Sequence, residues 1–182
     1  LETMGAFLDG LKFAGGSFSL MPPRAVKELI HLCHDYNVLA DTGGLMECVL
    51  TQGREAVDRY IAECKSLGFD IIEISAGFIT IPTDDWLRLV EKVKKAGLKP
   101  KPEVGIQFGA GGASAAEELE AEGTRDPEWA IFQAKRFLDA GAYMIMIESE
   151  GITENVKVWR TDVPAKMVNA LGLDKVMFEA AE

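Results

Sequence analysis

The chain has 182 residues with 48% hydrophobic residues, which is enough for one domain over 1–182 with a buried core. Its formal net charge of -10 argues against nucleic acid and against an anionic membrane surface as partners. No apolar run approaches the roughly 20 residues that span a bilayer. Three cysteines without CxxC spacing fit a reducing, cytoplasmic location.

Predicted strands and helices alternate along the chain. In chain order they are a strand at 8–13, a helix at 22–37, a strand at 38–42, a helix at 54–67, a strand at 69–75, a helix at 83–97, a strand at 98–105, a helix at 126–139, a strand at 143–148, a helix at 161–171 and a strand at 175–179. The strand at 98–105 is less obvious because its two prolines remove ladder donors. In the helix at 126–139, the residues available for packing are Trp129, Phe132, Ala134 and Phe137.

This alternation indicates a parallel α/β protein with right-handed crossovers. A doubly wound open sheet would normally place one Gly-rich phosphate loop after its first strand. The sequence instead places polar residues after several strands, which favours a TIM-type (β/α)8 barrel. Such a barrel usually needs about 250 residues, so we expect its first and last strands to lie outside this chain.

Five predicted strands end in an acidic residue or run directly into one. The acids are Asp41 and the four glutamates Glu73, Glu103, Glu148 and Glu179. Because the carboxyl ends of barrel strands converge on one face, and a buried carboxylate needs a partner, these acids indicate a shared site. Side-chain alternation points the glutamates toward one face, where they would hold Mg²⁺ as metal ligands, with Lys12 and Lys101 as counter-charges. The alternative is that each acid is a solvated strand end paired with a nearby lysine.

Two glycine pairs follow predicted strands and would expose backbone N–H groups to a phosphate. They are Gly15-Gly16, followed by Ser17, and Gly43-Gly44. Arg160 is a candidate phosphate clamp because its guanidinium suits bidentate binding of an oxyanion. Plain turns and a surface arginine are the alternatives. The Gly-rich run at 109–114 lacks the GKS or GKT ending of a phosphate loop, so we interpret it as a lid or a plain loop.

Several motifs occur in an order that resembles one known family. They are Leu11-Lys12-Phe13 with Gly15-Gly16-Ser17, Gly43-Gly44 with Glu47, the segment 68–75 (GFDIIEIS), Glu103-Val104-Gly105, Asp139-Ala140-Gly141-Ala142 and Val176-Met177-Phe178-Glu179-Ala180. This ordered set resembles the phosphosulfolactate synthases and their relatives, which include a heat-stress-associated protein of plants. The resemblance covers nearly the whole chain and implies a (β/α)8 barrel.

The resemblance implies a lyase that adds sulfite to phosphoenolpyruvate with Mg²⁺ as cofactor, giving phosphosulfolactate. The substrate would be a small phosphorylated anion, and a homo-oligomer is compatible with the sequence. Sulfite would attack the methylene carbon, and Mg²⁺ with cationic side chains would stabilise the enolate before a general acid protonates it. By the same resemblance, the site would be lined by Lys12, Glu73, Glu103, Glu148 and Glu179, with Arg160 as an anion contact.

The sequence departs from the family at the proton donor. The resemblance implies two lysines after Glu103-Val104-Gly105, the second of them the proposed donor, but this chain has Ile106-Gln107. Gln107 cannot act as a general acid at neutral pH, and loss of a general acid typically lowers the rate about 10²- to 10⁴-fold. Lys101 lies on the same face of the strand and is the candidate substitute, although we expect it deeper in the barrel.

Two other functions remain open from the sequence. One is a non-catalytic barrel with a stress-related or interaction role that keeps the fold and the anion pocket. The other is an unrelated aldolase-type barrel, which would need a lysine at a strand centre for a Schiff base, with Lys101 as the partial candidate. Metal dependence separates the synthase from the non-catalytic barrel, because only the enzyme predicts stabilisation by a divalent cation.

Overall fold

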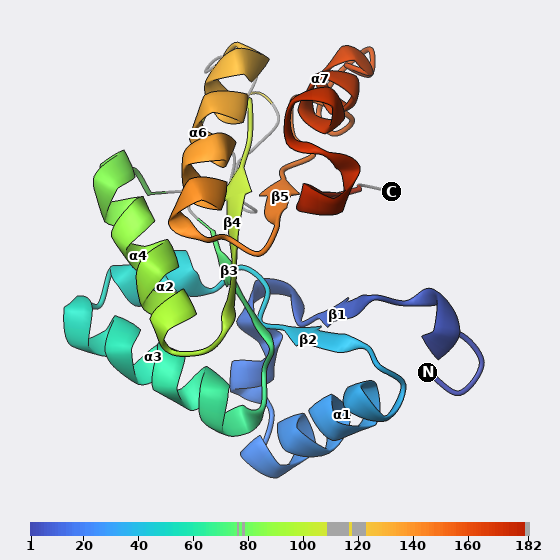
Figure 1. Ribbon diagram of the computed structural model, residues 1–182, viewed down its shortest axis with the longest axis vertical. Helices are drawn as coiled ribbons and strands as arrows, with labels where there is room; N and C mark the ends of the chain where they lie inside the picture. The colour runs from blue at the N-terminus through green and yellow to red at the C-terminus, as the bar shows by residue number, and fades with distance from the viewer. Residues whose placement is uncertain (76, 78, 109–116, 118–122, 181–182) are drawn as a thin grey trace. The chain divides into compact units, whose positions relative to one another are not determined.

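The computed structural model describes residues 1–75, 77, 79–108, 117 and 123–180 (Figure 1). The chain divides into two compact units, Leu1–Ser75 with Lys92–Pro100 and Ala76–Glu91 with Lys101–Glu182. Helix α4 (Thr83–Lys95) and strand β4 (Lys99–Val104) each contribute residues to both units. Every helix in the described ranges is too short or too polar to span a bilayer.

The first unit contains the parallel strands β1 (Gly10–Lys12), β2 (Leu39–Asp41) and β3 (Ile71–Ile74) and the helices α1 (Pro23–Asp35), α2 (Met46–Leu50) and α3 (Arg54–Leu67). Lys12 lies opposite Asp41, and Asp41 lies opposite Ile71. The N–H of Lys99 donates to the carbonyl of Asp70 (2.8 Å), so β4 begins beside β3. Each strand is therefore added next to the previous one, as in a barrel, whereas a doubly wound sheet reverses direction.

Apolar side chains at helical and strand spacing hold the first unit together. On α1, the buried residues Val26, Ile30 and Cys33 form one stripe at i, i+4 and i+7. In the same unit, the ring of Phe69 packs against Phe13 and Phe18, with centroids 5.2 Å and 4.8 Å away. These contacts fix the turn that follows β1, which contains the first predicted glycine pair.

The second unit contains the end of β4, the strands β5 (Ile145–Ile147) and β6 (Val176–Phe178), and the helices α6 (Pro127–Ala140) and α7 (Asp162–Leu171). The strands are parallel, with Glu103 opposite Met146 and Met146 opposite Met177. Helix α6 begins as the sequence predicts, because the Asp126 side chain accepts a hydrogen bond from the N–H of Glu128 (2.9 Å). The register of β4, β5 and β6 places the carboxyl ends of these neighbouring strands side by side.

The predicted strands and the five long helices are confirmed, and two features differ. Helix α2 has no counterpart among the predicted elements, because its 5 residues are too few to show a periodic stripe. On α6, the packing role predicted for Trp129 and Phe132 is wrong, since these side chains are 42% and 62% exposed. Ala134 and Phe137 are buried as expected. The buried stripe continues through Ile131, and the two exposed rings lie off that stripe.

Candidate functional site

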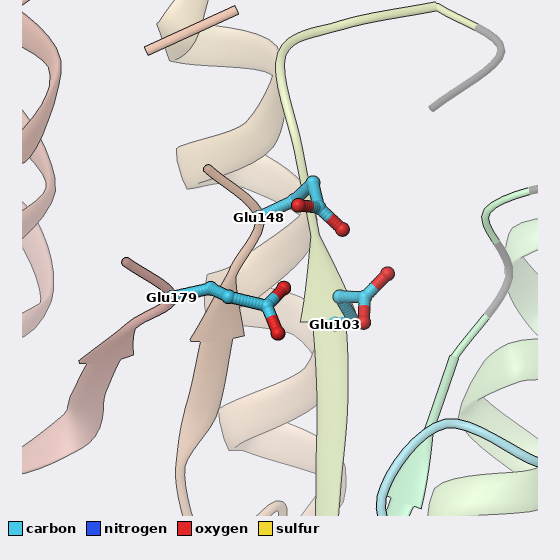
Figure 2. A group of neighbouring side chains, drawn as sticks. All are labelled: Glu103, Glu148 and Glu179. Atoms are coloured by element: carbon cyan, nitrogen blue, oxygen red, sulfur yellow. The ribbon is translucent and has the colours of Figure 1, made fainter. Parts of the chain in front are cut away.

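Three glutamates of the second unit meet at the ends of its strands (Figure 2). Glu103 lies in β4, Glu148 follows β5 and Glu179 follows β6. The ladder places them, because the N–H of Glu148 donates to the carbonyl of Val104 (3.0 Å) and the N–H of Glu179 to that of Ile147 (2.9 Å). One carboxylate oxygen of each glutamate lies within 4.8 Å of the others. Figure 2 shows the three side chains directed into the same space.

The electrostatics of this three-glutamate cluster are dominated by burial and like charge. Burial raises the pKa of Glu148 to about 7, and repulsion from Glu179 and Glu150 adds to the shift. The backbone N–H of Ser149 donates to Glu148 Oε1 (2.8 Å), which opposes the shift. Oxygen ligands that repel one another in this way suit a hard divalent cation, whose charge would favour the ionised form of Glu148.

A pocket of about 570 Å³ opens beside two of these glutamates. Its lining includes Glu103 and Glu148 together with Gln107, Arg125 and Trp129. The volume is that of a small-molecule site, and the lining offers both carboxylates and a cation. The pocket can therefore hold a small ligand with a negatively charged group near Arg125 and a second group near the carboxylates of Glu103 and Glu148.

Gln107 lines this pocket with its side-chain amide already engaged. Its Nε2 donates to the carbonyls of Phe108 (3.1 Å) and Gly123 (2.9 Å). An isolated antiparallel bridge also joins Gln107 to Thr124. Gln107 therefore links residues 107–108 to residues 123–124, which is a structural role that a general acid would not need.

Arg125 is the pocket residue that sequence reasoning missed. Its guanidinium carbon lies 4.2 Å from the centroid of the Phe108 ring and 4.4 Å from that of Trp129. The guanidinium is partly withdrawn from water, and this burial lowers its pKa. An arginine directly before the predicted helix start at Asp126 is the only sequence signal, and it does not reveal the ring contacts.

Lys101, the predicted substitute donor, lies on the same strand as Glu103 but deeper. Its side chain is fully buried, and Nζ lies 3.9 Å from Met177 Sδ. It is absent from the lining of the described pocket. Its burial agrees with the expectation that residue 101 lies below the mouth of the strand end.

The fourth predicted metal ligand, Glu73, belongs to the first unit, where it pairs with Lys12. Lys12 Nζ lies 3.2 Å from Glu73 Oε1, and the Glu73 side chain is 1% exposed. The hydroxyl of Thr42 accepts a hydrogen bond from the N–H of Glu73 (3.2 Å). Lys12 and Glu73 thus form an ion pair at the ends of β1 and β3, in which Glu73 is buried and Lys12 is half-buried.

Gly43 and Gly44 form a tight turn beside this ion pair. The N–H of Gly43 donates to Asp41 Oδ1 (3.1 Å), so this N–H is already used within the protein. Gly43 has a φ of 64°, and a Cβ there would lie 2.2 Å from the carbonyl oxygen of Phe13. A Cβ on Gly44 would lie 3.4 Å from Glu73 Oε1. The turn therefore needs glycine for close packing as well as for its backbone conformation.

The remaining predicted anion contacts are not among the residues that line the described pocket. Gly15 and Gly16 have φ of 57° and 69° inside the 3-10 segment Ala14–Leu20, which also contains the exposed Ser17. Arg160 donates through Nε and Nη2 to the two carboxylate oxygens of Asp162 (2.8 Å and 2.9 Å). Its bidentate face is thus used by a neighbour two residues along the chain. The predicted Gly-rich loop at 109–114 lies outside the described residues.

Comparison of the sequence with family models matches residues 1–182 to the family described as (2R)-phospho-3-sulfolactate synthase. The chain belongs to the phosphosulfolactate synthase family. It is 37% identical over 191 residues to Protein HEAT-STRESS-ASSOCIATED 32 of Arabidopsis thaliana, covering 100% of this chain and 67% of that protein. Against the phosphosulfolactate synthases of Methanothermobacter thermautotrophicus and Methanocaldococcus jannaschii, identity is 25% and 28%, with 69% and 70% of those proteins covered. In both cases 100% of this chain is covered.

Solved structures that resemble this member of the phosphosulfolactate synthase family share its fold at low identity. The carboxyl transferase domain of Rhizobium etli pyruvate carboxylase matches 96% of this chain with a TM-score of 0.57 and 12% identity. N-acetylneuraminate lyase from Mycoplasma synoviae matches 95% with a TM-score of 0.52 and 16% identity. The chain spans only 29% and 51% of those two chains. With the parallel strands described above, these likenesses support a TIM-type fold.

Proposed function

We propose that the protein is a lyase of the phosphosulfolactate synthase type, which adds sulfite to phosphoenolpyruvate or to a related enol phosphate in a Mg²⁺-dependent reaction. The observation that carries this proposal is the convergence of Glu103, Glu148 and Glu179 beside a small-molecule pocket. The family match over residues 1–182 supports the reaction type. The proposed location is the cytoplasm.

The three-glutamate cluster fits Mg²⁺ in its donor chemistry. Carboxylate oxygens are the ligands that this hard ion prefers, and their spacing within 4.8 Å allows three of them to share one ion. Glu103, Glu148 and Glu179 would hold it. When bound, Mg²⁺ supplies positive charge that stabilises negative charge developing on the carboxylate of the substrate.

The residues of the chain then bind and orient the reactants. In the proposed reaction the sulfur lone pair of sulfite forms a bond to the methylene carbon, and the electron pair of the double bond moves toward the carboxylate. A proton must then reach the neighbouring carbon. Gln107 cannot provide it, since its amide has no acidic proton and is hydrogen-bonded to two carbonyls. The proton therefore comes from another group or from water.

The glutamine at position 107 also favours a second function. Gln107 stands where the resemblance implies the donor lysine, and the plant heat-stress-associated protein is 37% identical while the two synthases are 25% and 28% identical. A diverged, non-catalytic barrel with a stress-related or interaction role would keep the fold and the anion pocket. It would have no need of the cation cluster.

The test is a mass-spectrometric assay of the purified full-length protein with phosphoenolpyruvate, sulfite and Mg²⁺. We expect phosphosulfolactate from the wild type, at least ~10²-fold less from Glu103→Gln, and wild-type rates from the surface control Glu63→Gln. Adding Gln107→Lys separates the two functions. If only Gln107→Lys forms product, the wild type has kept the substrate pocket but has lost the general acid. If none of these proteins forms product, the proposed reaction is rejected.

A further inference from the structure

Arg125 is held in a fixed orientation at the wall of the pocket. Its backbone N–H donates to the carbonyl of Ile106 (2.5 Å), which ties residue 125 to the end of β4. Next to it, residues 107 and 124 form an antiparallel bridge. The guanidinium therefore projects from backbone that is anchored on both sides, and its orientation is set before any ligand arrives.

Two aromatic rings hold the plane of this guanidinium. Phe108 and Trp129 lie 4.2 Å and 4.4 Å from the guanidinium carbon. Rings at this distance attract the cation through their faces and leave its N–H edge directed away from them. The rings are themselves 37% and 42% exposed, so burial of the rings does not explain the arrangement. The stack instead presents a cation with donors available to a ligand.

Most of the other arginines are paired with a carboxylate of this chain. Five of the six are paired: Arg24 with Glu28, Arg59 with Glu55, Arg88 with Asp85, Arg136 with Asp84 and Arg160 with Asp162. Among the described residues, Arg54 and Arg125 make no such pair, and of these two only Arg125 lines the pocket. The adjacent Asp126 instead accepts a hydrogen bond from the N–H of Glu128 at the start of α6. In a chain of net charge -10, a pocket arginine without a carboxylate partner is a strong candidate for an anionic ligand.

We propose that Arg125, stacked between Phe108 and Trp129, binds the phosphate group of the substrate in this pocket. The assignment rests on the proposed function, in which a cation held by the three glutamates would stabilise negative charge on the carboxylate of the enol phosphate. The phosphate is the other anionic group of that molecule. Arg125 lines the same pocket as Glu103 and Glu148, and a guanidinium donates two parallel N–H groups to phosphate oxygens. Arg125 is thus a substrate-binding residue, and Phe108 and Trp129 are positioning residues that act through it.

The experiment measures binding of inorganic phosphate, phosphoenolpyruvate and sulfite by calorimetry, without turnover. We expect Arg125→Gln to weaken phosphate and phosphoenolpyruvate binding about 10- to 100-fold, because a charge-assisted hydrogen bond is lost. Arg125→Lys should restore part of the affinity, since it keeps the charge but not the fork. Sulfite binding should stay within twofold. The matched control is Arg88→Gln, which removes an exposed arginine from an ion pair on α4.

Three outcomes would overturn the assignment. They are unchanged phosphate binding in Arg125→Gln, an equal loss in Arg88→Gln, or a loss confined to sulfite. Circular dichroism melting of each variant separates lost binding from lost folding. Because phosphate binding needs neither sulfite nor product, a protein that binds phosphate through Arg125 but forms no phosphosulfolactate would reject the proposed reaction and leave this assignment standing.

Discussion

Glu148 couples the candidate site to pH. Its pKa in the folded protein is raised to about 7 from an ordinary value of 4.5, mainly by burial. Because the folded state favours the neutral carboxyl, the stability that this group contributes is fully present below about pH 4.5 and is lost as pH rises through 7. The same ionisation prepares the carboxylate for a cation, so tight cation binding should require pH above that range.

The pH dependence is tested by urea unfolding of wild type and Glu148→Gln in the presence of EDTA. Between about pH 5 and about pH 8, the free energy of unfolding of the wild type should fall relative to the variant by at most about 3 kcal/mol, before allowance for solvent screening. The variant lacks the titrating group and serves as the reference. A difference that stays constant across this range would show that Glu148 titrates normally.

Individual site residues differ in how far the sequence reveals them. Glu103, Glu148 and Glu179 follow from the alternation of strands and helices. Glu148 and Glu179 each end a recognisable apolar run, whereas Glu103 follows from the position of its strand between two predicted helices. Arg125 does not, because its role depends on rings at positions 108 and 129 that only the bridge between residues 107 and 124 brings together. Arg160 shows the opposite case, in which the side chain suits an oxyanion but an aspartate two residues away already uses it.

At the scale of elements, the turn after β2 is a connection in the first unit that leaves no room for a side chain at Gly43. We predict that Gly43→Ala lowers the free energy of unfolding by at least about 2 kcal/mol, since the added Cβ meets a backbone oxygen that cannot move aside. Gly53→Ala is the matched control, because Gly53 also has positive φ (89°) but has no atom within 4 Å of the added Cβ. Thermal unfolding of both variants measures the difference. Equal losses in the two variants would assign the cost to backbone strain alone.

Elements with a clear apolar period are predictable, and those set by tertiary contacts are not. Strand β4 is the less obvious strand in the sequence, because Pro100 and Pro102 have no N–H to donate to a ladder. The strand is fixed at its start by the N–H of Lys99, which donates to the carbonyl of Asp70, and at its end by the carbonyl of Val104, which accepts from the N–H of Glu148. The short helix α2 has too few residues to show an apolar period, and it comes directly after the turn at Gly43 and Gly44.

At the scale of the whole molecule, an acidic protein is proposed to bind two anionic reactants. A net charge of -10 repels phosphoenolpyruvate and sulfite at long range, so binding must depend on local positive charge. In the second unit that charge would come from Arg125 and from a cation at the three glutamates. The sequence alone predicts the parallel α/β class and the acidic strand ends, because both follow from local pattern. It does not predict the two compact units, which arise from contacts between distant segments.

The most direct test of the account is calorimetric melting of the full-length protein with rising Mg²⁺ at about pH 8, where Glu148 is ionised. A cation at 100 times its dissociation constant should add about 2.7 kcal/mol, which raises the melting temperature by roughly 5 to 10 °C. Glu103→Gln should abolish most of this rise, while Glu63→Gln should retain it. Equal melting temperatures of the wild type with and without Mg²⁺, or an undiminished rise in Glu103→Gln, would contradict the claim that the three glutamates form the cation site of a synthase.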